Sequence, residues 1–199
     1  YALEGSVVTA GAAVQWLRDG LGIISESSEI GPLAESVSDA GGVFVVPAFT
    51  GLGSPWWDPY ARGTIVGITR GTTKAHIARA VVDAMVYQTR DAIEAMTRAG
   101  GVQLTELRVD GGASVMNAMV QRQANELGVP VLRPTDHETT ALGAAYAAGL
   151  AVGFWSSTDE VRKQWQQSRR WNATSTEQQR TVGYAGWKKA VERTLNWVD

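Results

Sequence analysis

Cysteine is absent from the 199 residues of the chain, and histidine occurs only twice. Without cysteine the chain can form no disulfide, no thiolate nucleophile and no zinc site of the cysteine type. This absence agrees with a reducing compartment, and we expect a cytoplasmic protein. His137 stands between two carboxylates in "TDHETT", but the only other histidine, His76, lies on a different predicted helix. Acidic residues near a helix start commonly serve the helix dipole, so the sequence predicts no metal site here.

An excess of charge of either sign is also lacking. The chain has 18 Lys and Arg against 20 Asp and Glu, a formal net charge of -2. Such a balance creates no basic field for nucleic acid or an anionic membrane, and we expect neither as a partner. The first residues have no initiator Met, basic region or long apolar run, so we expect no secretory signal and a start inside a longer protein.

Long hydrophobic runs suited to a membrane are missing as well. The uncharged segment from Thr139 to Thr158 is mostly Ala and Gly, with polar residues at both ends. Its apolarity is weak for a bilayer span. It therefore predicts a helix buried against other protein, capped by Thr139 or Thr140.

Hydrophobic residues make up 44% of the chain, enough for the core of one packed domain. Apolar spacing predicts helices over 9–21, 74–99 and 113–127, and strands over 42–49, 63–69, 107–110 and 129–134. The polar segment 25–42 is expected to lie outside the core. The alternation of strands and helices predicts an α/β fold with parallel strand pairs. After Gly153 the pattern indicates a helical tail, with a helix capped by Ser175 or Thr176 that reaches Trp197.

The stretch "LRVDGGASVMN", from Leu107 to Asn117, places two glycines between a predicted strand and a predicted helix. At the carboxyl end of a strand, the next helix presents unpaired N–H groups and the positive end of its dipole. Gly111 and Gly112 lack the Cβ atoms that would hold a flat or anionic ligand away from that backbone. The pair could equally form a tight turn without any ligand.

The segment "GTIVGITRGTTKAHIARAVVD", Gly63 to Asp83, resembles the second signature of the FGGY carbohydrate kinases, members of the actin-like ATPase superfamily. Within that family, "YALEG" at Tyr1 to Gly5, "VPAFTGLGSPWWDPYARG" at Val46 to Gly63 and "GYAGWKKAV" at Gly183 to Val191 are similar to the glycerol kinases. Many other sugar kinases of the family have Gly-Glu-Arg in place of the Gly-Leu-Gly that begins at Gly51. The resemblance implies an actin-like ATPase or ribonuclease H-like domain over residues 1–199. Its mixed sheet would be flanked by helices, with a helical C-terminal tail and without the N-terminal catalytic and substrate domain.

The resemblance also implies the reaction and its ligands. FGGY kinases of this kind transfer the γ-phosphoryl group of ATP, bound with Mg²⁺, to glycerol. Gly11, Gln15, Gly112 and Ala113 match nucleotide-contacting positions of the family. The proton-accepting aspartate and the glycerol-binding residues precede this segment in the family, so no catalytic residue is assigned here. Asp110 is interpreted as a strand-end carboxylate that fixes the turn. Homo-oligomerisation is left open.

One departure from the family pattern concerns Met116, where the family usually has an Asn that contacts the nucleotide. Asn117 comes one position later, and one residue along a continuous helix rotates a side chain by about 100°. We therefore predict that Met116 lines the adenine pocket by apolar contact and that one polar contact is lost. On this interpretation Met116→Asn should tighten ADP binding a few-fold.

Two other functions are compatible with the sequence: a kinase for another polyol or a pentulose, and a non-catalytic actin-like nucleotide-binding or interaction module. The loop "PWWDPY" could be an aromatic ligand platform, but a packed loop is favoured. The tryptophans and arginines of the tail could bind single-stranded nucleic acid, but a helical pattern of this kind favours tryptophans that cover a core.

Overall fold

The computed structural model describes residues 2–199, so Tyr1, the first residue of the "YALEG" match, lies outside the described residues. The helices are α1 (Gly11–Gln15), α2 (Ile30–Glu35), α3 (Lys74–Gly100), α4 (Asn117–Leu127), α5 (Thr139–Ala151), α6 (Thr158–Arg162) and α7 (Glu177–Glu192). The strands are β1 (Phe44–Val46), β2 (Thr64–Val66), β3 (Leu107–Arg108), β4 (Val131–Pro134) and β5 (Gln167–Trp171). A π-helical turn (Trp16–Gly20) and two 3₁₀ turns (Ser27–Glu29 and Gly112–Val115) complete the elements.

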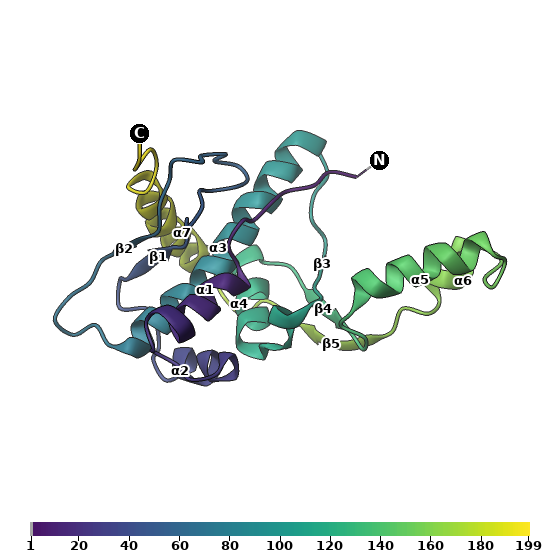
Figure 1. Cartoon of the computed structure of the whole chain (residues 1–199), viewed down its shortest axis with the longest axis horizontal. Helices are drawn as coiled ribbons and strands as arrows, with labels where there is room; N and C mark the ends of the chain where they lie inside the picture. The colour runs from purple at the N-terminus through teal and green to yellow at the C-terminus, as the bar shows by residue number, and fades with distance from the viewer. Residues whose placement is uncertain (1) are drawn as a thin grey trace.

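The strands form two small sheets: β1 of the first sheet lies against the long helix α3, whereas β4 and β5 of the second sheet lie against α4 (Figure 1). In the first sheet β1 pairs with β2 in antiparallel orientation, whereas in the second β3 and β4 are parallel and β4 and β5 antiparallel. Parallel pairing is thus confirmed for β3 and β4 and wrong for β1 and β2. The chain between β1 and β2 is a loop without a crossover helix, and a parallel pair requires such a crossover.

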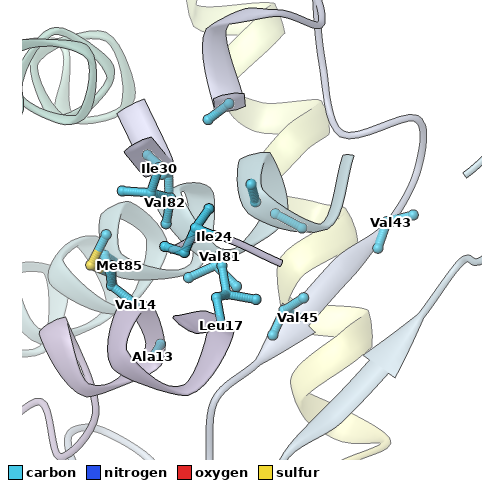
Figure 2. Close-up of a cluster of buried hydrophobic side chains, with 13 residues drawn as sticks. Ala13, Val14, Leu17, Ile24, Ile30, Val43, Val45, Val81, Val82 and Met85 are labelled. Atoms are coloured by element: carbon cyan, nitrogen blue, oxygen red, sulfur yellow. The ribbon is translucent and has the colours of Figure 1, made fainter. Parts of the chain in front are cut away.

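Helix α3 is the centre of the fold. It begins with a capping box in which the Thr73 backbone N–H donates to Nδ1 of His76, at 3.1 Å, and its C-cap residue is Gly101, with a left-handed φ of 65°. Its buried residues Val81, Val82 and Met85 meet α1, α2 and β1 in the main hydrophobic cluster (Figure 2). His76 therefore has a capping role.

The opposite side of α3 holds α7 through one buried carboxylate. Asp91 accepts hydrogen bonds from Tyr184 Oη (2.5 Å), Trp187 Nε1 (2.8 Å) and Trp56 Nε1 (3.2 Å). Burial raises the pKa of Asp91 above its usual range, and these three donors oppose the shift. Because Trp56 belongs to the "PWWDPY" loop, the prediction of a packed loop is confirmed, although Trp57 is exposed.

The C-terminal tail differs from the predicted run of helices. Gln167–Trp171 forms strand β5 instead, because it can pair with the free edge of β4 and bury the Trp171 ring. The Thr176 cap of α7 is confirmed as a capping box with Gln179, but the helix ends at Glu192 and Trp197 is exposed.

Helices α5 and α6 project as an arm, on the right of Figure 1. Gly149 is the only buried residue of α5 within the described chain, so the expectation of a buried helix is wrong here. The cap is also wrong: Glu138 occupies the N-cap position, and its side chain makes no capping hydrogen bond. Among residues 2–199, no helix is both long enough and apolar enough to cross a membrane.

Two elements near the N-terminus also depart from the sequence pattern. The helix predicted over 9–21 is a short α1 followed by the π-helical turn. The segment expected to lie outside contains α2, whose Ile30 and Ala34 are buried in the main cluster. Pro32 is compatible with this helix because the first turn requires no intrahelical N–H donor.

Candidate functional site

A cavity of about 690 Å³ lies where α1, α2, α3 and the start of α4 meet. Its size falls in the range of small-molecule sites, which is about 300–1,000 Å³. All five residues predicted as nucleotide contacts line it: Gly11, Gln15, Gly112, Ala113 and Met116. The structure therefore brings together two chain segments, 11–15 and 112–116, that are far apart in sequence.

The two glycines of "VDGGA" have different roles in the geometry of this cavity. Gly111 has φ 74° and ψ 178°, a backbone conformation that is essentially restricted to glycine. Gly112 has no such φ, and a Cβ atom built on it would meet no heavy atom within 4 Å. Gly111 is thus needed to form the turn, whereas Gly112 leaves an open stretch of backbone at the cavity.

The turn is held by hydrogen bonds that do not involve Asp110. The Gly111 N–H donates to the His137 carbonyl (3.0 Å), and Ser114 Oγ donates to the Gly111 carbonyl (2.7 Å). The carboxylate of Asp110 is exposed and has no hydrogen bond to another described residue. The interpretation of Asp110 as the group that fixes the turn is therefore wrong.

Helix α4 does not start where the sequence predicts it. Residues 112–115 form a 3₁₀ turn, Met116 is extended with φ −76° and ψ 95°, and the α-helix begins at Asn117. The prediction of one continuous helix over 113–127 is therefore wrong, and the orientations of Met116 and Asn117 do not follow from a single helical register. Both side chains line the cavity, and the first N–H groups of α4 lie at its edge.

Part of the cavity wall is apolar. Val14 of α1 and Met85 of α3 line it, and Met116 packs against the main hydrophobic cluster. A Cβ atom on Gly31 of α2 would lie 3.4 Å from Met116 Cγ, so the two segments are in close contact. Such a wall suits the face of a flat ring, while the polar Gln15 lies at the exposed side.

Sequence reasoning missed the contribution of the segment 27–35, which holds a 3₁₀ turn and α2, to the cavity. Ser27, Ser28, Gly31, Pro32 and Glu35 all line it. A signal was present in the Ile-Gly-Pro-Leu-Ala sequence that starts at Ile30, whose apolar residues are spaced as on a short helix. The surrounding serines and glutamates made the segment resemble a surface loop.

Ion pairs fix α4 against α3 behind the cavity. Arg122 pairs with Asp83, and Arg90 Nη1 lies 2.6 Å from Glu126 Oε1. Burial raises the pKa of Asp83 above its usual range, and the neighbouring Arg122 and Arg79 oppose that shift. These contacts join the middle and the C-terminal end of α4 to α3.

The donor groups do not form a metal cage. Within residues 2–199 no group of three His, Asp or Glu side chains is arranged to hold a metal ion. His137 contributes its carbonyl to the turn, and its Nδ1 is buried with no partner among the described residues. Glu35 is the one carboxylate among the residues that line the cavity in the described chain.

Comparison with solved structures defines the class of the fold. The crystal structure of Plasmodium falciparum glycerol kinase with ADP matches with a TM-score of 0.89 and 35% identity, over 98% of this chain and 39% of that one. A ligand-bound xylulose kinase of Lactobacillus acidophilus matches with a TM-score of 0.75 over 95% of this chain and 38% of that one, and its 21% identity shows the fold alone. The chain is therefore a domain with the actin-like ATPase fold of the carbohydrate kinases.

Sequence comparison gives the family. The C-terminal domain of the FGGY family of carbohydrate kinases matches residues 1–152, and the chain belongs to this family. A glycerol kinase of Deinococcus radiodurans is 60% identical over 199 residues, which is all of this chain and 40% of that protein. The chain thus spans about 40% of the length of such relatives.

Proposed function

We propose that the chain is the nucleotide-binding domain of an ATP-dependent glycerol kinase, which converts glycerol and ATP to glycerol 3-phosphate and ADP. The observation that carries the proposal is the single cavity lined by Gly11, Gln15, Gly112, Ala113 and Met116. Relatives named glycerol kinase at 55–60% identity, and a related structure that contains ADP, support the choice of ligand and substrate.

In this proposal the chain binds and orients the nucleotide. The apolar wall at Met116 and Val14 receives the base, and the bare backbone at Gly112 lies against the ribose or the phosphates. The start of α4 presents N–H groups and a positive dipole end, which favour negative charge. Phosphoryl transfer depends largely on such positioning and charge stabilisation.

The proposed division of labour leaves catalysis and glycerol binding to a preceding N-terminal domain, with residues 1–199 as the C-terminal domain. Within the described chain Glu35 is the only carboxylate that lines this cavity, so the chain could supply at most one carboxylate ligand to Mg²⁺ there. Mg²⁺ is commonly held by one or two carboxylates together with substrate phosphates. We therefore place its protein ligands mainly outside this chain.

The decisive experiment is an assay of the full-length protein with ATP and either glycerol or xylulose, in parallel. We expect a much higher kcat/KM for glycerol. A preference for xylulose would transfer the proposal to pentulose kinases. Loss of both activities in a protein that still binds ADP would favour a non-catalytic nucleotide-binding module.

A second measurement tests the division of labour. The chain of 199 residues by itself should form no glycerol phosphate above a matched blank. It should bind ADP only weakly, near the millimolar range or about -4 kcal/mol, since half of the cleft is missing. Steady glycerol phosphorylation by the pure fragment would contradict this assignment.

A further inference from the structure

Arg133 of β4 connects the two short segments on either side of Met116. Its Nη1 donates to the Ser114 carbonyl at 2.9 Å and to Oδ1 of Asn117 at 3.1 Å. The guanidinium lies over the ring of the buried Trp171, 5.0 Å from the ring centroid. One side chain thus holds both the 3₁₀ turn after Gly111 and the first residue of α4.

The hydrogen bond from Arg133 also decides which way the Asn117 amide is turned. Arginine has only donors, so it must face the amide oxygen. The Nδ2 group of Asn117 then carries two N–H donors that have no partner among the described residues. Asn117 is exposed and lines the cavity, so these donors are available to a ligand there.

We propose that Arg133 is a positioning residue that presents Nδ2 of Asn117 to an acceptor atom on the base or ribose of the nucleotide. This inference rests on the proposed function. Asn117 would supply the polar contact that the family pattern assigns to the position of Met116. The extended backbone at Met116 makes this possible, because the two residues do not belong to one continuous helix.

Arginine suits this role better than lysine. One guanidinium nitrogen carries two hydrogens, which can reach the Ser114 carbonyl and Asn117 Oδ1 at the same time. The flat group also stacks on Trp171, which limits its movement. A lysine ammonium would keep the positive charge but lose the fixed fork.

The chain offers a matched control in Arg169. It lies directly opposite Arg133 in the β4–β5 pair and also stacks on Trp171, at 4.8 Å. It has no hydrogen bond to the glycine turn or to Asn117 in the described chain. Arg169→Met therefore removes an equivalent stacked charge without touching the cavity.

The test is calorimetric titration of ADP into the full-length protein and its variants. Arg133→Met and Asn117→Ala should each weaken ADP binding about three- to tenfold, the value of one hydrogen bond. The double variant should be no weaker than the weaker single variant, because both changes remove the same contact. Arg169→Met should stay within about twofold of the wild type, because surface changes away from a site have small effects.

Two further variants separate positioning from charge and from folding. The Arg133→Lys variant should bind ADP as weakly as the Arg133→Met variant. If Arg133 acted only by attracting the phosphates with its positive charge, the lysine variant would keep the wild-type affinity. Asn117→Asp keeps an acceptor for Arg133 and suits a helix N-terminus, so its thermal midpoint should not fall. It loses the two donors and should therefore bind ADP less tightly.

Additive losses in the double variant, rescue by lysine, or wild-type affinity in Asn117→Asp would each overturn the inference. If Arg133→Met does not fold, the Lys and Asp variants decide. Absence of ADP binding in the wild type would instead refute the proposed function, so the two failures can be distinguished.

Discussion

The two glycines of the "VDGGA" turn should respond oppositely to the same substitution. Gly111→Ala forces an alanine into a backbone conformation with φ 74° and ψ 178°. Such a conformation costs about 1–3 kcal/mol. For a domain of this size, that cost corresponds to a fall in Tm of roughly 2–12 °C. Gly112→Ala adds a methyl group with no protein atom within 4 Å, so the free energy of unfolding should change by less than about 0.5 kcal/mol.

At Gly112 the alanine substitution should weaken nucleotide binding although it leaves the free energy of unfolding almost unchanged. A methyl group inserted where the backbone contacts a ligand should cost about 1–3 kcal/mol, as in an overpacked core, or roughly 5- to 150-fold in affinity. In the full-length protein Gly112→Ala should therefore unfold like the wild type and bind ADP much more weakly. Gly112→Val should enlarge the loss and raise the apparent KM for ATP.

The assay pairs calorimetric ADP titration with thermal unfolding of each variant. Gly143→Ala is the control, because Gly143 lies in the α5 arm with no atom within 4 Å of its added Cβ and is not part of the cavity. Wild-type ADP affinity in a folded Gly112→Ala protein would refute the reasoning, and the glycine pair would then be only a turn. An unchanged Tm in Gly111→Ala would refute the conformational argument.

Three other substitutions test separate contacts. Met116→Asn should lower Tm, because Met116 packs on the main hydrophobic cluster, and it should not tighten ADP binding if Asn117 already supplies the polar contact. Tighter ADP binding in calorimetry would instead restore the prediction made from the helix register. Asp91→Asn should destabilise the protein by about 1–3 kcal/mol in thermal or urea unfolding, since three side-chain donors converge on this buried carboxylate. A Tm equal to that of the wild type would contradict this role. Asp58 accepts hydrogen bonds from backbone N–H groups, first that of Asn196, and these hold its pKa below its usual range. The contact therefore stabilises the folded tail at pH values above the ordinary Asp pKa. This stabilisation is lost as the pH falls through the lower pKa that Asp58 has in the folded state. Asp58→Ala should therefore expose the C-terminus to limited proteolysis at neutral pH, whereas unchanged cleavage would argue against the clamp.

Local sequence by itself was sufficient for the elements whose signals lie within one segment. The apolar spacing and flanking glycines predicted α3 almost residue by residue, because a long amphipathic helix with caps encodes its own boundaries. The cap of α7 at Thr176 was likewise readable, since a capping box uses neighbouring residues. The family resemblance assigned Gly11, Gln15, Gly112, Ala113 and Met116 to the nucleotide, and those residues line one cavity.

Tertiary structure alone decided the features that depend on distant partners. β5 exists because β4 offers a free edge, and the exposed residues of the strand carry no such signal. Met116 lies between Ser114 and Asn117, both of which Arg133 of β4 contacts from a distant part of the chain. Gly111, with its left-handed φ, donates its N–H to the carbonyl of His137, a residue from a distant part of the chain. Each of these outcomes is set by a contact between residues far apart in the chain, and no local propensity or periodicity contains it.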